Sequence, residues 1–215
     1  MVEALNYAIV EVQKNADTRP LDYLPELYMS RMYIILGKGN GDPSYNDKAL
    51  EHSLRALKIA PTFVRTYYEV AQAYLNKKDY AKAIESFKKA AELNPKVGVS
   101  YWYLGATQME SGDTQNGLKS LEQAIQNGYG PNEGDYQRLL GVYLKLNDFN
   151  KLASIYEKLV SINPNNPQYH ASLAVAYAKI GKIDAAVAEA KKAAQLDSTF
   201  TLEAKAFVQS LGRVW

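Results

Sequence analysis

The 215-residue sequence predicts an all-α fold assembled from repeated pairs of helices. The stretch AYLNKKDYAKAIESFKKAAELNP at 73–95 returns, altered, as VYLKLNDFNKLASIYEKLVSINP at 142–164, 69 residues further on. This offset is about twice 34 residues, and a fixed period of that size is typical of arrays of stacked supersecondary units. In both copies the apolar residues recur at helical spacing, and a proline closes the segment.

Weaker copies of the same pattern lie before, between and after these two. One is YWYLGATQMESGDTQNGLKSLEQAIQNGYGP, which begins at Tyr101, and another begins at Tyr169. The earliest has LYMSRMYIILGKG followed by NDKALEHSLRALKIAP. The sequence therefore predicts five units, at about 23–63, 64–97, 98–131, 133–166 and 167–200.

Each unit is predicted to form two helices. In the second unit, Val70, Ala71 and Tyr74 fall at helical spacing, and the polar break NKKD separates them from a second apolar face that includes Phe87. The unit ends at Pro95, because proline cannot continue the helical hydrogen bonds. One helix pair cannot bury its own apolar face, so neighbouring units must stack.

Small residues two turns apart on the second helix allow the two helices of a unit to approach closely. They are Ala49 with Ala56, Ala83 with Ala90, Gly117 with Ala124, and Ala186 with Ala193. The fourth unit has Leu140, Leu152 and Leu159 where other units have small residues. A locally wider helix pair is expected there, partly compensated by Ala153.

Three segments depart from the repeat. The first unit contains about seven extra residues within GKGNGDPSYN (37–46), predicted to be a flexible insert. Its GKGNG run is not a phosphate loop, because a helix precedes it and no Lys-Ser/Thr follows. Helices at 2–16 and 201–212 are predicted to cap the two ends of the array.

The repeat resembles the tetratricopeptide repeat. The features that match are an aromatic site in each first helix, the Val70-Ala71 to Tyr74 spacing, a loop aromatic and a closing proline. These sites hold Tyr67, Tyr101, Tyr136 and His170, then Tyr80 and Phe149, then Pro61, Pro95 and Pro164. In the third unit Tyr129 replaces the proline. The resemblance implies a right-handed superhelical solenoid, forming a single domain over 1–215.

Composition argues against several classes of function. The 25 basic and 23 acidic side chains nearly balance, so the electrostatic field that nucleic acid requires is missing. The chain has no cysteine, which excludes thiol catalysis and zinc–thiolate sites. His170 is interpreted as a packing residue and His52 as solvent-exposed. No catalytic residue, metal site or cofactor is expected, and the chain as given is predicted to be soluble, in the cytoplasm unless a membrane segment precedes it.

In tetratricopeptide arrays the first helix of each unit lines a concave groove that binds peptides or partner helices. The resemblance therefore implies a protein-binding scaffold, and the residues expected on that face share the helical spacing of the first helices. They are Tyr28, Arg31 and Ile35; Arg65, Tyr68, Glu69, Gln72 and Asn76; Val99, Trp102, Tyr103, Ala106 and Glu110; Gln137, Arg138, Gly141 and Lys145; Ser172 and Lys179.

The first half of this expected groove is aromatic and the second half is more basic. An apolar anchor of a ligand is expected near Tyr68, Trp102 and Tyr103, and a carboxylate near Arg138 and Lys145. The alternative, left open, is that each ring packs against the next unit. The Asn/Lys pattern of members that clamp chaperone tails is not present, which disfavours that ligand.

A second, narrower resemblance rests on phrases such as RPLDYLPELYMSRMYIILGKG and SLAVAYAKIGKIDAAVAEA. They are similar to the C-terminal repeat tails of bacterial O-antigen ligase-like and polymerase-like membrane proteins. This resemblance implies the alternative function of an accessory tail that contacts glycan or organises the complex. The chain would then be a domain of an inner-membrane protein, with the catalytic residues outside this sequence.

Overall fold

The computed structural model describes residues 2–39 and 42–215, and every regular element in them is a helix. They separate into two compact units, Met1–Gly130 and Pro131–Trp215, which we describe one at a time. From here on, the first unit and the second unit are these two parts of the chain, and the five predicted helix pairs are called repeats. The single domain expected from the sequence remains a prediction.

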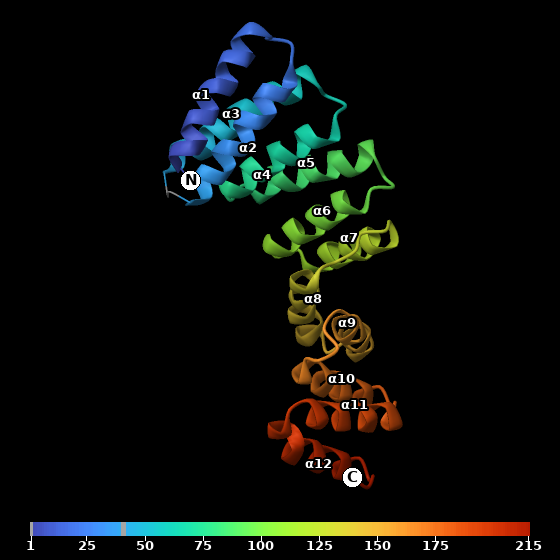
Figure 1. Cartoon of the computed structure of the whole chain (residues 1–215). Helices are drawn as coiled ribbons and strands as arrows, with labels where there is room; N and C mark the ends of the chain where they lie inside the picture. Colours follow the sequence, from blue (N-terminus) through green and yellow to red (C-terminus); the bar gives the residue numbers. More distant parts are fainter. Residues whose placement is uncertain (1, 40–41) are drawn as a thin grey trace. The chain divides into compact units, whose positions relative to one another are not determined.

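The first unit contains α1 to α7, coloured blue to yellow-green in Figure 1. The helices are α1 (Val2–Thr18), α2 (Tyr23–Gly39), α3 (Pro43–Ile59), α4 (Val64–Asn76), α5 (Tyr80–Leu93), α6 (Gly98–Glu110) and α7 (Thr114–Gln126). α2 pairs with α3, α4 with α5, and α6 with α7. α3 also packs on α4, and α5 on α6, so that each pair stacks on the next as the repeat requires.

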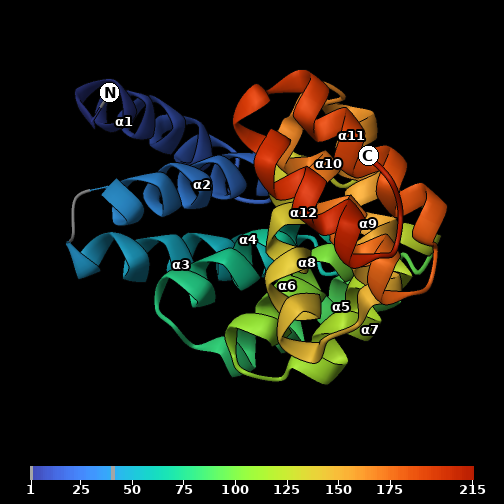
Figure 2. The ribbon, with the colours of Figure 1, turned by 90° about the horizontal axis from the view of Figure 1, so that it is seen from below.

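The second unit contains α8 to α12 (Figure 2). The elements are α8 (Glu133–Leu146), α9 (Phe149–Ile162), α10 (Pro167–Lys179), α11 (Ile183–Leu196), the short 3₁₀ helix η1 (Ser198–Phe200) and α12 (Thr201–Ser210). α10 packs on both α9 and α11, and α12 packs on α11. Ala204 and Val208 of α12 are buried against Ala174 and Ala190, so α12 covers the last helix pair.

The small residues of the second helices are buried, as predicted. Ala49, Ala56, Ala83, Ala90, Ala124, Ala186 and Ala193 are all at most 1% exposed. At Gly117, an added Cβ would lie 3.0 Å from the carbonyl oxygen of Gly105 on α6 and 2.4 Å from a side-chain carbon of Met109. The backbones of α6 and α7 therefore meet at these two glycines.

The turn between the two helices of a repeat contains one residue with positive φ in four of the repeats. Lys78, Gly112, Asn147 and Gly181 occupy this position, with φ values of 59°, 93°, 53° and 79°. A side chain in the left-handed region clashes with its own backbone, which glycine avoids. Two repeats therefore use glycine, one uses asparagine, which tolerates the left-handed region, and one holds lysine, which is strained there.

The next residue caps the second helix. The side chains of Asp79, Asp113 and Asp148 accept hydrogen bonds from the first free backbone N–H groups of α5, α7 and α9. At the start of α11 the position is held by Lys182, which gives no such bond although its backbone has nearly the same φ and ψ. α11 therefore lacks the side-chain cap that the equivalent aspartate gives to α5, α7 and α9.

The flexible insert predicted within 37–46 is wrong for most of that segment. Gly37 to Gly39 lie in the last turn of α2, and Pro43 to Asn46 form the first turn of α3. Residues 40–41, within GKGNG, lie outside the described part. The extra residues lengthen both helices to 17, against 13 and 14 in α4 and α5. Pro43 can begin a helix because the first helical position needs no N–H bond.

The α8–α9 pair contains three large side chains at positions where other repeats have small residues. Leu140, Leu152 and Leu159 are all buried within this repeat. The wider helix pair that the sequence predicts for this repeat stays a prediction.

Candidate protein-interaction groove of the first unit

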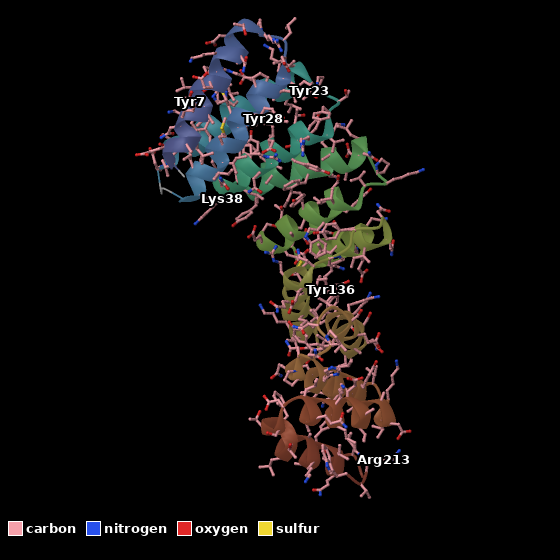
Figure 3. All side chains as sticks on the ribbon, viewed as in Figure 1. Tyr7, Tyr23, Tyr28, Lys38, Tyr136 and Arg213 are labelled. Carbon is pink, nitrogen blue, oxygen red and sulfur yellow. The ribbon has the colours of Figure 1, made fainter. Side chains whose placement is uncertain are left out.

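The first helices α2 and α4 present polar and aromatic side chains on one shared face. On α2, Tyr28, Arg31 and Ile35 follow the helical repeat and are exposed. Figure 3 labels Tyr28 and Lys38 on this helix. On α4, Arg65 is exposed while Tyr68 and Gln72 are half-buried. These are the predicted groove positions, and in the first unit the fold brings them together.

A cavity of about 280 Å³ lies on this face. Arg31, Ile34, Ile35 and Lys38 of α2, Tyr68, Glu69 and Gln72 of α4, Phe87 of α5 and Tyr103 of α6 line it. A smaller cavity beside it shares Arg31 and Glu69 and is bordered by Tyr28 and Arg65. We call this surface, from α2 across α4 to Tyr103 of α6, the first-unit groove.

Three rings form the apolar end of the first-unit groove. Tyr103 stacks on Phe87 with centroids 5.5 Å apart, and meets Tyr68 edge-on at 5.8 Å. Phe87 is buried, whereas Tyr103 remains 43% exposed. The cluster therefore anchors α4, α5 and α6 to one another and still offers one aromatic edge to a ligand.

The Tyr68 hydroxyl and the Ser100 hydroxyl share a hydrogen bond of 2.6 Å that joins α4 to α6. Burial raises the pKa of Tyr68, and the bond to Ser100 opposes that rise. Tyr68 is thus a neutral, positioned side chain at neutral pH.

The polar end of the first-unit groove is an ion pair between Arg31 on α2 and Glu69 on α4, with Nη2 and Oε1 3.0 Å apart. Glu69 is buried and Arg31 is half exposed. Burial raises the pKa of Glu69, and the positive charges of Arg31 and Arg65 partly counter that rise. With Lys38 at the cavity wall, positive side chains outnumber the single carboxylate here.

Trp102 is packed inside the fold. Its side chain is 4% exposed and stacks on Tyr129, with centroids 4.6 Å apart and planes 19° from parallel. Of the two alternatives left open by the sequence, this geometry fits packing. It also gives a reason for Tyr129 in place of the closing proline, because the ring supports the indole.

The remaining predicted residues of the first unit lie further along. Asn76 donates from its amide to the backbone oxygen of Ile34 at 3.2 Å and to the Asn46 side chain at 3.3 Å. It therefore joins α4 to α2 and α3. Glu110 is exposed at the end of α6, and Val99 and Ala106 are half-buried on the same helix.

The predicted groove residues of the second unit are exposed on α8 and α10. Gln137, Arg138, Gly141 and Lys145 lie on α8, and Lys179 ends α10, where Ser172 is half-buried. Gln137 donates to the Tyr169 hydroxyl at 3.0 Å, and the Lys179 amine lies 5.8 Å from the Phe149 ring centre. Tyr136 of the same unit is labelled in Figure 3.

Both histidines are buried, which corrects the expectation for His52. Its Nδ1 lies 2.7 Å from a carboxylate oxygen of Glu26, and its ring stacks on Tyr33. His170 is buried as predicted, with Nδ1 2.6 Å from Glu189 and Nε2 2.9 Å from the Pro164 carbonyl. Both pairs tie the two helices of a repeat together. Among the described residues, no three His, Cys, Asp or Glu side chains converge as metal ligands.

The sequence reasoning missed Ile34, Lys38 and Phe87 as groove residues. Lys38 lies seven residues after Arg31, two helical turns along the same face, so periodicity could have found it. Phe87 was assigned to the core of its own repeat, and it does lie there. It also reaches the groove because the second helix fills the gap between successive first helices.

These features define a helical-repeat protein whose first helices α2 and α4 share one polar and aromatic face. Tetratricopeptide repeat models match residues 64–97, 136–166 and 155–188. The chain therefore contains tetratricopeptide repeats. Among the described residues, no helix combines the length and the apolar character needed to cross a membrane.

Among curated proteins, the chain is similar to the Hsp70-Hsp90 organizing protein of Triticum aestivum. The two are 29% identical over 192 residues, which cover 86% of this chain and 31% of that protein. Hsp70-Hsp90 organizing protein 2 of Arabidopsis thaliana is 27% identical over 177 residues, 79% of this chain and 29% of that protein. The chain thus spans about a third of the length of these relatives.

Solved structures show the same fold. The crystal structure of MamA protein aligns with a TM-score of 0.55 and 27% identity, over 79% of this chain and 92% of that one. YrrB, described as a TPR protein with an unusual peptide-binding site, aligns with a TM-score of 0.58 over 91% of this chain and 97% of that one. Its identity is 20%, so this likeness concerns the fold alone. The resemblance to O-antigen ligase-like tails gains no support from these comparisons.

Proposed function

We propose that this chain is a non-catalytic scaffold that binds a peptide or helix of a partner protein in the first-unit groove. The observation that most supports this is the cavity between α2, α4 and α6, where a half-exposed ring, Tyr103, lies beside charged side chains fixed by neighbouring helices. Interfaces concentrate binding energy in such aromatic and arginine residues.

The relatives support the same class of function. The names of the wheat and Arabidopsis proteins describe organisers of two other proteins, and the description of YrrB includes a peptide-binding site. No observation favours the alternative of an accessory tail that contacts glycan. A protein or peptide partner is therefore the proposal that we carry forward.

Two exposed tyrosines of the first unit make a matched test. Tyr103 lies in the groove at 43% exposure, and Tyr7 lies on α1 at 70% exposure (Figure 3). Proteins captured from cells of the source organism by the wild-type chain would be compared with those captured by Tyr103→Ala and by Tyr7→Ala. The proposal requires a protein whose capture is lost with Tyr103→Ala and retained with Tyr7→Ala. Equal retention of every captured protein by both variants would contradict it.

A further inference from the structure

The second unit contains an apolar cavity of about 230 Å³ between α10, α11 and α12. Its floor consists of small side chains, and two rings of the C-terminal segment form one wall. The lining residues are Ala171, Ala174, Val175, Ala190, Ala193, Phe200, Glu203, Ala204 and Phe207. None of them belongs to the groove positions that the sequence predicts.

The repeat itself explains why this space is open. Positions 103 residues apart are equivalent, as Lys78 and Gly181 in the turn and Ala83 and Ala186 in the helix contact show. By this offset, Ala171 corresponds to Tyr68 and Ala190 to Phe87.

In the first unit, those two rings lie 6.2 Å apart, centre to centre, and fill the space between α4, α5 and α6. In the second unit both positions hold alanine, so neither α10 nor α11 supplies a ring to the corresponding space, and the rings of Phe200 and Phe207 border it from the C-terminal segment.

The size of the cavity matches an aromatic side chain. An apolar cavity of about 150 Å³ is large enough to bind benzene. The space between α10, α11 and α12 exceeds that volume, and its walls are almost wholly apolar. Water gains few hydrogen bonds there, so a ring supplied from outside would be favoured over water.

One charged residue borders the cavity. Glu203 lines it and is exposed, at the start of α12. A carboxylate at the rim of an apolar cavity favours a cation next to the group that enters. Glu203 therefore favours aromatic ligands that carry a positive charge next to the ring.

We propose that this cavity binds an aromatic side chain of a partner peptide whose neighbouring residue is lysine or arginine. The ligand's ring takes the space that Tyr68 and Phe87 fill in the first unit, and its basic group pairs with Glu203. This site is separate from the proposed function of the first-unit groove, and either can fail without the other.

The test uses three blocked tetrapeptides, acetyl-Gly-Phe-Lys-Gly-amide and its Ala-Lys and Phe-Glu counterparts, titrated into the full chain labelled with ¹⁵N. The Phe-Lys peptide is expected to shift the amide signals of Ala174, Ala193 and Ala204. It should bind about tenfold or more tightly than the Ala-Lys peptide, because only phenylalanine buries a ring. It should bind about two- to fivefold more tightly than the Phe-Glu peptide.

Two variants with one control complete the experiment. Ala190→Phe supplies the missing ring and should abolish the shifts, whereas Ala188→Phe adds a ring at an exposed position of α11 that does not line the cavity and should leave them. Glu203→Lys should reverse the preference between the Phe-Lys and Phe-Glu peptides, and it tests the site even if Ala190→Phe does not fold.

Three results would overturn the proposal. One is equal binding of the Phe-Lys and Ala-Lys peptides. The second is the absence of shifts at these three amides up to millimolar peptide. The third is shifts confined to the first-unit groove, which would leave the proposed function intact.

Discussion

The indole of Trp102 lies against the ring of Tyr129, with centroids 4.6 Å apart and planes 19° from parallel. This pair joins α6 to the segment that follows α7, where the second repeat has Pro95. Trp102 occupies a groove position by sequence and a packing position by structure. The same residue type at the same helical spacing can serve either purpose, so periodicity could not choose between them.

Trp102→Ala is expected to lower the free energy of unfolding by about 3 to 5 kcal/mol, because it removes a buried ring and leaves a cavity. Chemical denaturation followed by circular dichroism measures the change. Tyr103→Ala, which removes a 43% exposed ring from the next residue, should cost clearly less. If the two variants lose the same stability, Trp102 is not the packing residue that the structure shows.

Lys78→Gly is expected to raise the free energy of unfolding by about 1 kcal/mol, because lysine pays for a left-handed backbone that glycine adopts freely. The reciprocal change Gly112→Lys, in the equivalent turn, should lower it by a similar amount. Thermal denaturation of both variants checks the pair. A loss of stability with Lys78→Gly would contradict the strain assigned to this turn.

Lys182→Asp is expected to stabilise the chain by about 0.5 to 1 kcal/mol, because aspartate can accept the free N–H groups at the start of α11. The model for this is Asp79, which caps α5 from nearly the same backbone conformation. Lys192→Asp makes the same charge change late in α11, where it opposes the helix dipole. Urea denaturation should therefore show a higher free energy of unfolding than wild type for Lys182→Asp and a lower one for Lys192→Asp.

The titration of the Glu69 carboxyl is expected to lower the free energy of unfolding as the pH rises. Burial raises the pKa of this carboxyl in the folded state above its value of 4.5 in the unfolded chain. The folded state therefore holds the proton more tightly, and its stabilising effect is full below pH 4.5. That effect is lost as pH rises through the folded-state pKa.

Glu69→Gln removes this titration. The free energy of unfolding of the wild type minus that of Glu69→Gln should decrease as the pH rises from 4 to 8. A shift in favour of the wild type over that range would show that the ion pair with Arg31 outweighs burial.

The all-α class, the helix pairs and the buried small residues followed from the sequence, because helical periodicity records which side of a helix is covered. Helical periodicity does not predict which residues far apart in the sequence pair with each other. His52 was expected in solvent, yet it pairs with Glu26, 26 residues earlier. The extra residues of the first repeat were expected to form an insert. Most of them instead extend the end of α2 and the beginning of α3.

The candidate groove was predictable in part for the same reason. Arg31, Tyr68 and Tyr103 lie on the expected face, because spacing along each first helix fixes direction. Burial depends on what packs above that face, which one helix does not reveal. Glu69 and Trp102 are therefore buried although their positions match exposed groove residues.

The most direct test of the central claim, that partner protein binds in the first-unit groove, is photo-cross-linking from defined positions. Benzoylphenylalanine would replace Tyr103 in the groove or Arg55, an exposed residue of α3. After irradiation in cells of the source organism, the account predicts a cross-linked protein from position 103 and none of that mass from position 55. The same adduct from both positions, or from position 55 alone, would contradict it.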